Sequence, residues 1–340
     1  MSGIRQNPAD PSLLPLISVV VPCYNEEHAL GALHRALTDA LAARTDIRYE
    51  IIFVDDGSSD RTPQILGRLA SVDHRIVVIT LTRNFGHQAA ITAGLSSARG
   101  QAVIVCDADL QDTPAAMLMM IDKWLEGGAD IIYGVRNRQN TSLVKRATYF
   151  AFYRVLRGLA KPEIPLDSGD FGLMDRKVVD AINALPERNR FVRGLRAWVG
   201  YEQAPLAYDR PARRLGKSKY SFMRLLSLAL DGIFDFSTKP LSLIFYLGMA
   251  SSLLSFAGVI FYLIYWLIGF TIFGRSPADV PGFTSLVLAI FFLGGVQLLA
   301  IGLLGEYVGR IYKEVKRRPN FIVKSVRDTE KSRPDCDLSG

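Results

Sequence analysis

Cysteine is scarce in this chain of 340 residues, which contains only Cys23, Cys106 and Cys336. Three widely separated cysteines cannot form a disulfide framework, and no two of them have the close spacing that is typical of a zinc site. We therefore expect the folded part of the chain to lie in a reducing, cytosolic compartment.

Two glycine-rich nucleotide motifs are also missing. No Gly-x-Gly-x-x-Gly follows the first apolar run, residues 17–22, and this argues against a dinucleotide-dependent dehydrogenase. Gly216-Lys217-Ser218 resembles the end of a P-loop, but Pro211 stands where a P-loop requires its first glycine. The sequence therefore favours neither of these two common modes of nucleotide binding.

Charged residues are missing from two long stretches near the C-terminus, although 21% of the whole chain is charged. One stretch lies between Lys239 and Arg275, and the other between Asp279 and Glu306. Each is longer than the ~20 residues that cross a bilayer as a helix. We expect a two-helix transmembrane hairpin with spans at about 241–268 and 282–305.

The net charge of +7 is distributed as in a membrane protein, so we expect no nucleic-acid partner. Basic residues lie before the first span and after the second, while the loop between the spans holds only Arg275 and Asp279. The positive-inside rule then predicts a multi-pass membrane protein with both termini in the cytoplasm. The flanking basic residues are Arg213, Arg214, Lys217, Lys219, Arg224, Lys239, Lys313, Lys316, Arg317 and Arg318.

Four segments follow from these patterns. Residues 1–212 are expected to form a cytosolic domain, 213–238 a basic loop with an amphipathic helix, 239–309 the two spans, and 310–340 a basic cytosolic tail. The apolar side of the amphipathic helix fits either the membrane interface or the domain's own core. Gly302, Gly305 and Gly309 would let neighbouring spans approach closely, so a homo-oligomer is plausible.

The first segment alternates apolar runs with helical patterns, which predicts an α/β fold with a doubly wound, mostly parallel, Rossmann-like sheet. Strands are expected at residues 17–22, 49–54, 76–81, 103–106 and 130–133.

Acidic residues follow two of these strands directly. Asp107 and Asp109, with Gln111 beside them, offer hard oxygen ligands that suit Mg²⁺ or Mn²⁺. Asp55 and Asp56 can accept hydrogen bonds from a base or a ribose. Because ligands bind beyond the carboxyl ends of parallel strands, we expect both acidic pairs to open onto one crevice. His87, at a helix start, is interpreted as a cap or a supporting residue rather than a ligand.

Six motifs together resemble the membrane-bound inverting glycosyltransferases that move a sugar from a nucleotide to a polyprenyl phosphate. This family includes dolichol-phosphate mannosyltransferases, undecaprenyl-phosphate glucosyltransferases and the aminoarabinose transferase of lipid A modification. The motifs occur in the family's order and cover most of the chain. They are Pro22-Cys23-Tyr24-Asn25-Glu26, Val54-Asp55-Asp56-Gly57-Ser58-Ser59-Asp60, Arg83-Asn84-Phe85-Gly86, Asp107-Ala108-Asp109-Leu110-Gln111, Gly169-Asp170-Phe171 and Gly216-Lys217-Ser218-Lys219-Tyr220.

The resemblance implies a role for each matching residue. Asp170 would be the catalytic acid, together with Asp109. The expected metal ligands are Asp107, Asp109 and Gln111, with Mg or Mn as the ion. Residues that would bind the nucleotide sugar or the lipid phosphate are Pro22, Tyr24, Glu26, Asp55, Asp107, Arg136, Arg210, Arg213, Lys217 and Lys219.

Two positions depart from the family pattern. Gly172 stands where many members have arginine, and Lys217 stands where an acid is common.

Two other functions would also use acidic residues of this kind. A processive polysaccharide synthase would carry a Gln-x-x-Arg-Trp motif, for which Arg193-Gly194-Leu195-Arg196-Ala197-Trp198 is the nearest match. A non-enzymatic, membrane-anchored nucleotide-binding subunit would leave the converging acids without a purpose.

Overall fold

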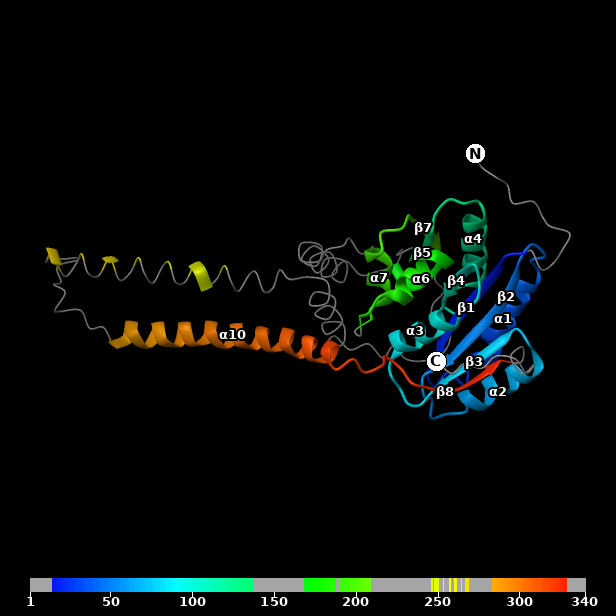
Figure 1. Cartoon of the computed structure of the whole chain (residues 1–340), viewed down its shortest axis with the longest axis horizontal. Coiled ribbons are helices and arrows are strands. Elements are labelled where there is room, and N and C mark those ends of the chain that lie inside the picture. Colours follow the sequence, from blue (N-terminus) through cyan, green and yellow to red (C-terminus); the bar gives the residue numbers. More distant parts are fainter. Residues whose placement is uncertain are drawn as a thin grey trace, which may run out of the picture. The chain divides into compact units, whose positions relative to one another are not determined.

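The computed structural model describes residues 14–136, 168–187, 190–208 and 283–328, together with separate positions between 246 and 268. The chain divides into two compact units, one containing the β-sheet and the other containing the long helix α10 (Figure 1). The strands are β1 (Leu16–Cys23), β2 (Arg48–Asp55), β3 (Ile76–Leu81), β4 (Ala102–Val105), β5 (Ile131–Arg136), β6 (Ser168–Asp175), β7 (Gln203–Tyr208) and β8 (Val323–Asp328). The helices are α1 (Leu30–Ala42), α2 (Thr62–Val72), α3 (His87–Ser97), α4 (Pro114–Leu125), α6 (Arg176–Ala184), α7 (Val192–Trp198) and α10 (Phe283–Val315).

The strands form one sheet in the order β7-β5-β6-β4-β1-β2-β3-β8. The central strands β4, β1, β2 and β3 are parallel, and so are β5 and β7. Only β6 and β8, among the described strands, run against the rest. The expected doubly wound and mostly parallel sheet is therefore confirmed, as a mixed sheet.

Helices cover both faces of the sheet, and the alternation of side chains along each strand explains why. In β1, Val19 and Val21 belong to one hydrophobic core with α1, α2 and α4, whereas Val20 belongs to a second core with α3, α6 and α7. A strand that is buried on both faces has few polar residues, and residues 17–21 are all buried and apolar except for Ser18.

The reversed strand β6 brings its N-terminal end to the carboxyl end of β4, because Val105 pairs with Gly172. A residue near the start of β6 therefore lies at the same edge of the sheet as residues just after β4. This edge is where ligands bind in open α/β sheets. The reversal places Asp170 there.

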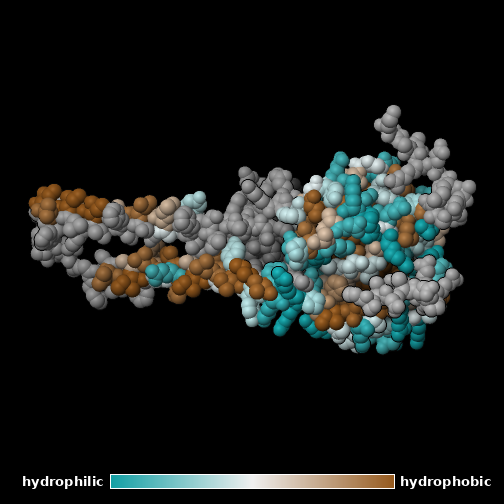
Figure 2. Space-filling view, in the orientation of Figure 1, coloured by the Kyte–Doolittle hydropathy of each residue, from teal (hydrophilic) through white to brown (hydrophobic). Residues whose placement is uncertain are grey.

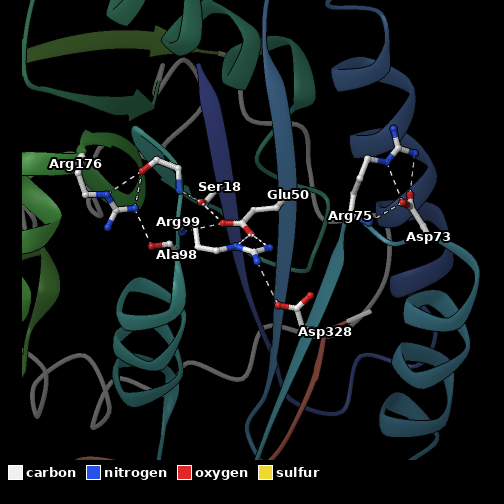
Figure 3. Close-up of polar contacts among 9 residues, drawn as sticks. Ser18, Glu50, Asp73, Arg75, Ala98, Arg99, Arg176 and Asp328 are labelled. Carbon is white, nitrogen blue, oxygen red and sulfur yellow. Dashed lines mark hydrogen bonds and ion pairs between the residues drawn. The ribbon is translucent and has the colours of Figure 1, made fainter. Parts of the chain in front are cut away.

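Strand β8 lies within residues 310–340, the segment expected to be a basic tail, for which the sequence predicted no strand. It pairs antiparallel with β3, with Val326 opposite Ile79. Asp328 is the last residue of β8 and lies beside Arg99. The Arg99 side chain also donates to the buried carboxylate of Glu50 (Figure 3). The tail therefore completes one edge of the catalytic domain's sheet.

Helix α10 contains the one segment, within the described part of the chain, that is long and apolar enough to cross a membrane, Phe292–Gly309. Its large side chains are exposed, including Leu298 and Ile301, and the space-filling view shows mostly hydrophobic atoms along it (Figure 2). The second expected span is thus a helix, with a C-terminal extension to Val315. The expected two-helix hairpin is not confirmed, because the first span, 241–268, includes only scattered described positions.

Candidate active site

The candidate site lies beyond the carboxyl ends of β1, β2 and β4. Strand β1 pairs with β2 on one side and with β4 on the other, so the chain crosses over between them. Such a switch of winding direction opens a crevice at the strand ends. The loops that follow β1, β2 and β4 supply the residues described next.

The loop after β4 is a tightly held acidic turn. The Asp109 carboxylate accepts from the backbone N–H of Gln111 at 3.1 Å. Between them, Leu110 has a φ of 60°, a left-handed conformation that is uncommon for leucine. The Leu110 side chain packs against the core, so the turn is fixed by its own packing.

Asp112 supports this turn from within the protein. It is buried, and its two carboxylate oxygens accept from the backbone N–H of Asp107 at 3.1 Å and from the Tyr208 hydroxyl at 2.9 Å. The carboxylate thereby joins the loop after β4 to the end of β7. Its role is to position Asp107.

Asp170 and Asp107 are brought together by His87. The His87 Nε2 atom lies 3.4 Å from Asp170 Oδ2 and 3.6 Å from Asp107 Oδ1. His87 is the first residue of α3, and it does not cap the helix with its side chain. His87 was predicted to be either a helix cap or a supporting residue. The structure confirms the second alternative, because the His87 side chain contacts both Asp107 and Asp170.

Two more side chains hold Asp170. Gln88 donates from Nε2 to Asp170 Oδ2 at 3.1 Å, and Arg193 Nε lies 3.5 Å from Asp170 Oδ1. The side-chain oxygen of Gln88, Oε1, also accepts from the backbone N–H of Val192 at 2.9 Å. One amide therefore fixes both the carboxylate and the start of α7.

The surroundings keep Asp170 ionised. Burial alone would raise its pKa, but the hydrogen bond from His87 and the charges of Arg193 and Arg196 outweigh burial and hold the pKa well below its usual range. Burial would likewise lower the pKa of His87, yet the Asp170 and Asp107 carboxylates raise it above its ordinary value. Burial lowers the pKa of Arg196 to about 10. Asp170 is thus a carboxylate of low basicity.

Asp107 has the opposite character. Burial, followed by the negative charge of Asp112, raises the pKa of the Asp107 carboxyl to about 6. Crowded carboxylates of this kind attract a cation, and oxygen donors suit Mg²⁺ or Mn²⁺. Among the residues with described placement, no group of three or more His, Cys, Asp or Glu side chains is arranged as a metal cluster. Mg²⁺ is commonly held by one or two carboxylates plus substrate phosphates, so Asp107 and Asp109 fit such an ion.

The loop after β2 supplies the second acidic pair. Asp55 is buried, and it accepts from the backbone N–H of Ser58 at 3.0 Å through one oxygen, while Oδ2 has no hydrogen-bond partner among the described residues. An unpaired buried acceptor fits a donor on a nucleotide. Asp56 corrects our expectation, because both of its oxygens accept from protein backbone, from Phe85 at 2.7 Å and Gly86 at 2.9 Å. Asp56 holds the loop 84–86 instead.

Gly57 is required by this packing. Its φ is 67°, and a Cβ atom would lie 2.4 Å from the backbone carbon of Arg83. The loop after β2 therefore touches the loop after β3 without room for a side chain.

The remaining expected residues fall into two groups. Pro22 is buried near the end of β1, Tyr24 is 45% exposed and Glu26 is half-buried in the following loop, so all three lie at the carboxyl end of β1. Arg136 ends β5, and only its backbone is described. Arg210, Arg213, Lys217 and Lys219 lie outside the described residues.

Several residues of the site were missed by sequence reasoning. Gln88, Asp112, Arg193 and Arg196 contact the expected acids or their loops through pairings between distant parts of the chain. The one available signal was the pair of arginines in the segment 193–198, which we compared only with another enzyme class. Arg196 is buried, and its Nη1 atom occupies the space that the missing Cβ of Gly172 leaves open.

A doubly wound sheet with carboxylates gathered at its switch point defines a Rossmann-like α/β domain of the nucleotide-binding class. Residues 18–182 match the family described as "Glycosyl transferase family 2". The chain belongs to this family, and it is a glycosyltransferase.

Its relatives match over nearly their whole length. An uncharacterised glycosyltransferase of Synechocystis is 46% identical over 91% of this chain and 95% of its own. The prophage-derived bactoprenol glucosyl transferase of Shigella flexneri is 42% identical over 91% of this chain and 97% of its own. Among solved structures, glucosyl-3-phosphoglycerate synthase from Mycobacterium tuberculosis is 20% identical, with a TM-score of 0.44 over 65% of this chain and 76% of that one.

Proposed function

We propose that this glycosyltransferase moves a sugar from a UDP- or GDP-linked donor to a polyprenyl (undecaprenyl) phosphate, with inversion at the anomeric carbon. The product would be a lipid-linked sugar donor for glycosylation of the cell envelope. The observation that carries the proposal is the convergence of Asp107 and Asp170 on His87, within 3.6 Å and 3.4 Å. Asp107, which would bind the metal ion of a metal–diphosphate, and Asp170, which would act on the reacting sugar, then share one site.

The acceptor is inferred from the relatives. Bactoprenol glucosyl transferases match this chain over 97% of their length, so the likeness extends beyond the catalytic domain into the C-terminal part. The apolar helix α10 and the basic stretch of sequence that contains Arg210, Arg213, Lys217 and Lys219 suit a lipid substrate whose phosphate stays in the headgroup plane. We place the enzyme in the bacterial plasma membrane, with its catalytic domain and both termini in the cytoplasm.

The ionisation of Asp170 suits a direct displacement. A phosphate monoester has a second pKa near ~6, so the acceptor is mostly a dianion at neutral pH and needs no strong base. Its oxygen forms a bond to the anomeric carbon, while the bond from that carbon to the diphosphate oxygen breaks on the opposite face. Asp170, with its lowered pKa, is a weak base whose negative charge stabilises the positive charge that develops on the sugar.

The divalent ion, held by Asp107, Asp109 and Gln111 together with the donor, would neutralise the charge on the leaving nucleoside diphosphate. Asp55 then accepts a hydrogen bond from the nucleoside through its unpaired Oδ2 atom. Tyr24 and Glu26 follow the carboxyl end of β1, the strand next to β2, and would bind the same nucleotide.

The test is transfer by the purified full-length protein in detergent. Radiolabelled UDP- and GDP-sugars are supplied with undecaprenyl phosphate and Mg²⁺ or Mn²⁺, and the lipid and nucleotide products are separated. We expect a lipid-soluble monosaccharide phosphate and equimolar nucleotide, formed only when both metal and lipid phosphate are present. A polymeric product would instead support a polysaccharide synthase, and the absence of turnover with every donor would support a binding subunit.

A further inference from the structure

Arg193 contacts Asp170 and helps to lower the pKa of its carboxyl, but part of the charged Arg193 side chain is also exposed. It follows the first residue of α7, and 31% of its side chain is exposed, whereas the Asp170 side chain beside it is only 11% exposed. A guanidinium at the mouth of a site is accessible to a bound molecule. Its partner carboxylate lies behind it.

The contact between Arg193 and Asp170 is incomplete. Arg193 Nε and Asp170 Oδ1 are 3.5 Å apart, and each of these buried atoms has no hydrogen-bond partner in the described part of the chain. A fully formed arginine–carboxylate pair would have two short parallel hydrogen bonds. The guanidinium thus has donors available for another anion.

Two contacts hold Arg193 in this place. The Gln88 amide connects Asp170 with the backbone N–H of Val192, the residue before Arg193, at 3.1 Å and 2.9 Å. The Arg193 guanidinium carbon also lies 5.4 Å from the centre of the Phe191 ring, which orients its plane. The residue is pre-positioned rather than loosely exposed.

Arg196, one helical turn later, cannot serve the same purpose. It is 2% exposed and donates to the Gly169 carbonyl oxygen at 3.4 Å. Its charge acts on Asp170 from inside the protein, so of these two described arginines only Arg193 has an exposed side chain.

We propose that Arg193 binds a substrate phosphate beside Asp170 during sugar transfer. The inference rests on the proposed function, in which the sugar passes between two phosphates at this carboxylate. A chain of three contacts leads from the expected metal ligand to Arg193. The distances are 3.6 Å from Asp107 to His87, 3.4 Å from His87 to Asp170 and 3.5 Å from Asp170 to Arg193. Arginine is well suited to phosphate because its planar fork offers paired donors. The phosphate is either that of the lipid acceptor or the diphosphate of the donor.

The experiment compares Arg193→Gln, Arg193→Lys and Arg68→Gln in the full-length enzyme. Arg68 is exposed on α2, so its replacement removes the same charge away from the site. Initial rates are measured with a short-chain, water-soluble prenyl phosphate and the preferred nucleotide sugar, each varied in turn. Thermal unfolding checks that each variant is folded.

We expect Arg193→Gln to raise one KM by about ten-fold or more, since a charge-assisted hydrogen bond is lost, while the other KM stays nearly constant. Arg193→Lys should show a smaller rise, and Arg68→Gln none. An increase in the KM of the prenyl phosphate identifies the acceptor as the bound phosphate, and an increase in the KM of the nucleotide sugar identifies the donor. Binding of the nucleoside diphosphate of the preferred donor, UDP or GDP, measured by equilibrium dialysis, should weaken only in the second case.

The inference is overturned if Arg193→Gln leaves both KM values equal to those of Arg68→Gln, whether or not kcat falls. A fall in kcat alone would mean that Arg193 acts only on Asp170. Failure of the proposed function looks different, because the unaltered enzyme would then transfer no sugar to the prenyl phosphate at all.

Discussion

Arg99 and Asp328 are 229 positions apart in the chain, yet Nη1 of the arginine lies 3.4 Å from Oδ2 of the aspartate. The same guanidinium donates to the buried Glu50 carboxylate from Nε at 2.9 Å and from Nη2 at 2.8 Å (Figure 3). Glu50 also accepts from the Ser18 hydroxyl at 2.6 Å. This network links the start of β1 and β2 to the end of β8.

Arg99→Ala should destabilise the domain, because it leaves the buried Glu50 without its counter-charge. Loss of one partner of a buried pair costs about 3 kcal/mol, which corresponds to a Tm about 6–12 °C lower for a domain of this size. Thermal unfolding of the purified protein in detergent measures the change. Arg35→Ala, on the exposed side of α1, is the control and should change Tm little. Equal melting of the two variants would show that the network contributes nothing.

Gly57→Ala should be more harmful than Gly127→Ala. Both glycines have positive φ, 67° and 78°, so both substitutions add the backbone cost of about 1 kcal/mol. Only at Gly57 would the new Cβ also collide with backbone, at 2.4 Å from Arg83, whereas nothing lies within 4 Å at Gly127. We expect a larger fall in Tm for Gly57→Ala than for Gly127→Ala, and weaker binding of the nucleoside diphosphate for Gly57→Ala alone. Matching Tm values would contradict the close packing of the loops after β2 and β3.

Asp109→Ala should lower kcat by at least about 100-fold, since the ion loses one of the two carboxylates that hold it. Raising Mg²⁺ or Mn²⁺ should restore little activity. Release of UDP or GDP from the donor is the measurement, and EDTA treatment of the unaltered enzyme should stop it until metal is added back. Asp39→Ala, which removes an exposed acid from α1, is the control. Normal turnover of Asp109→Ala would remove this residue from the metal site.

Cys23 and Cys106 should be inert toward alkylation in the folded protein. Both are buried, and burial, followed by the charge of Asp55 for Cys23 and of Asp112 for Cys106, raises the pKa of each thiol. In a Cys336→Ser variant we expect no modification by iodoacetamide at pH 8 until denaturant is added, and then two modified thiols by mass spectrometry. Rapid modification of the native protein would show that this part of the core opens readily.

The Cys336→Ser variant also allows a test of the membrane topology. A cysteine placed at Ser276 should react with a membrane-impermeant maleimide applied to whole spheroplasts, and a cysteine at Ser339 should react only after the membrane is permeabilised. The prediction follows from the basic residues that flank the two charge-free stretches. The reverse labelling pattern would place the termini outside the cytoplasm.

The sequence predicted the central strands well because their signal is local. Apolar runs buried on both faces located β1, β2 and β4, and the acids that directly follow β2 and β4 placed Asp55, Asp107 and Asp109 at one edge of the sheet. Neither β6 nor β8 could be found in this way. The direction of β6 and the pairing of β8 depend on contacts with distant strands, and the six residues of β8 include three charges.

The supporting residues of the site escaped for the same reason. Gln88 and Arg193 have ordinary local surroundings, and their meaning comes from Asp170, which is 82 positions from Gln88. Asp56 shows the opposite case, in which a residue in a convincing motif serves the fold. Hydrogen bonds to Phe85 and Gly86 use both of its oxygens, a fact that no spacing in the sequence reveals.

The position of β8 after α10 sets an order for biosynthesis. The edge of β3 that β8 covers stays open until residue 328 has left the ribosome, after all of α10 has been made. Domains begin to fold during synthesis, and unpaired strand edges are prone to aggregate. A nascent chain of this glycosyltransferase therefore carries an open sheet edge throughout the translation of its apolar helix. Stop codons placed between residues 316 and 322 should yield protein that aggregates, although every residue of the candidate site is present.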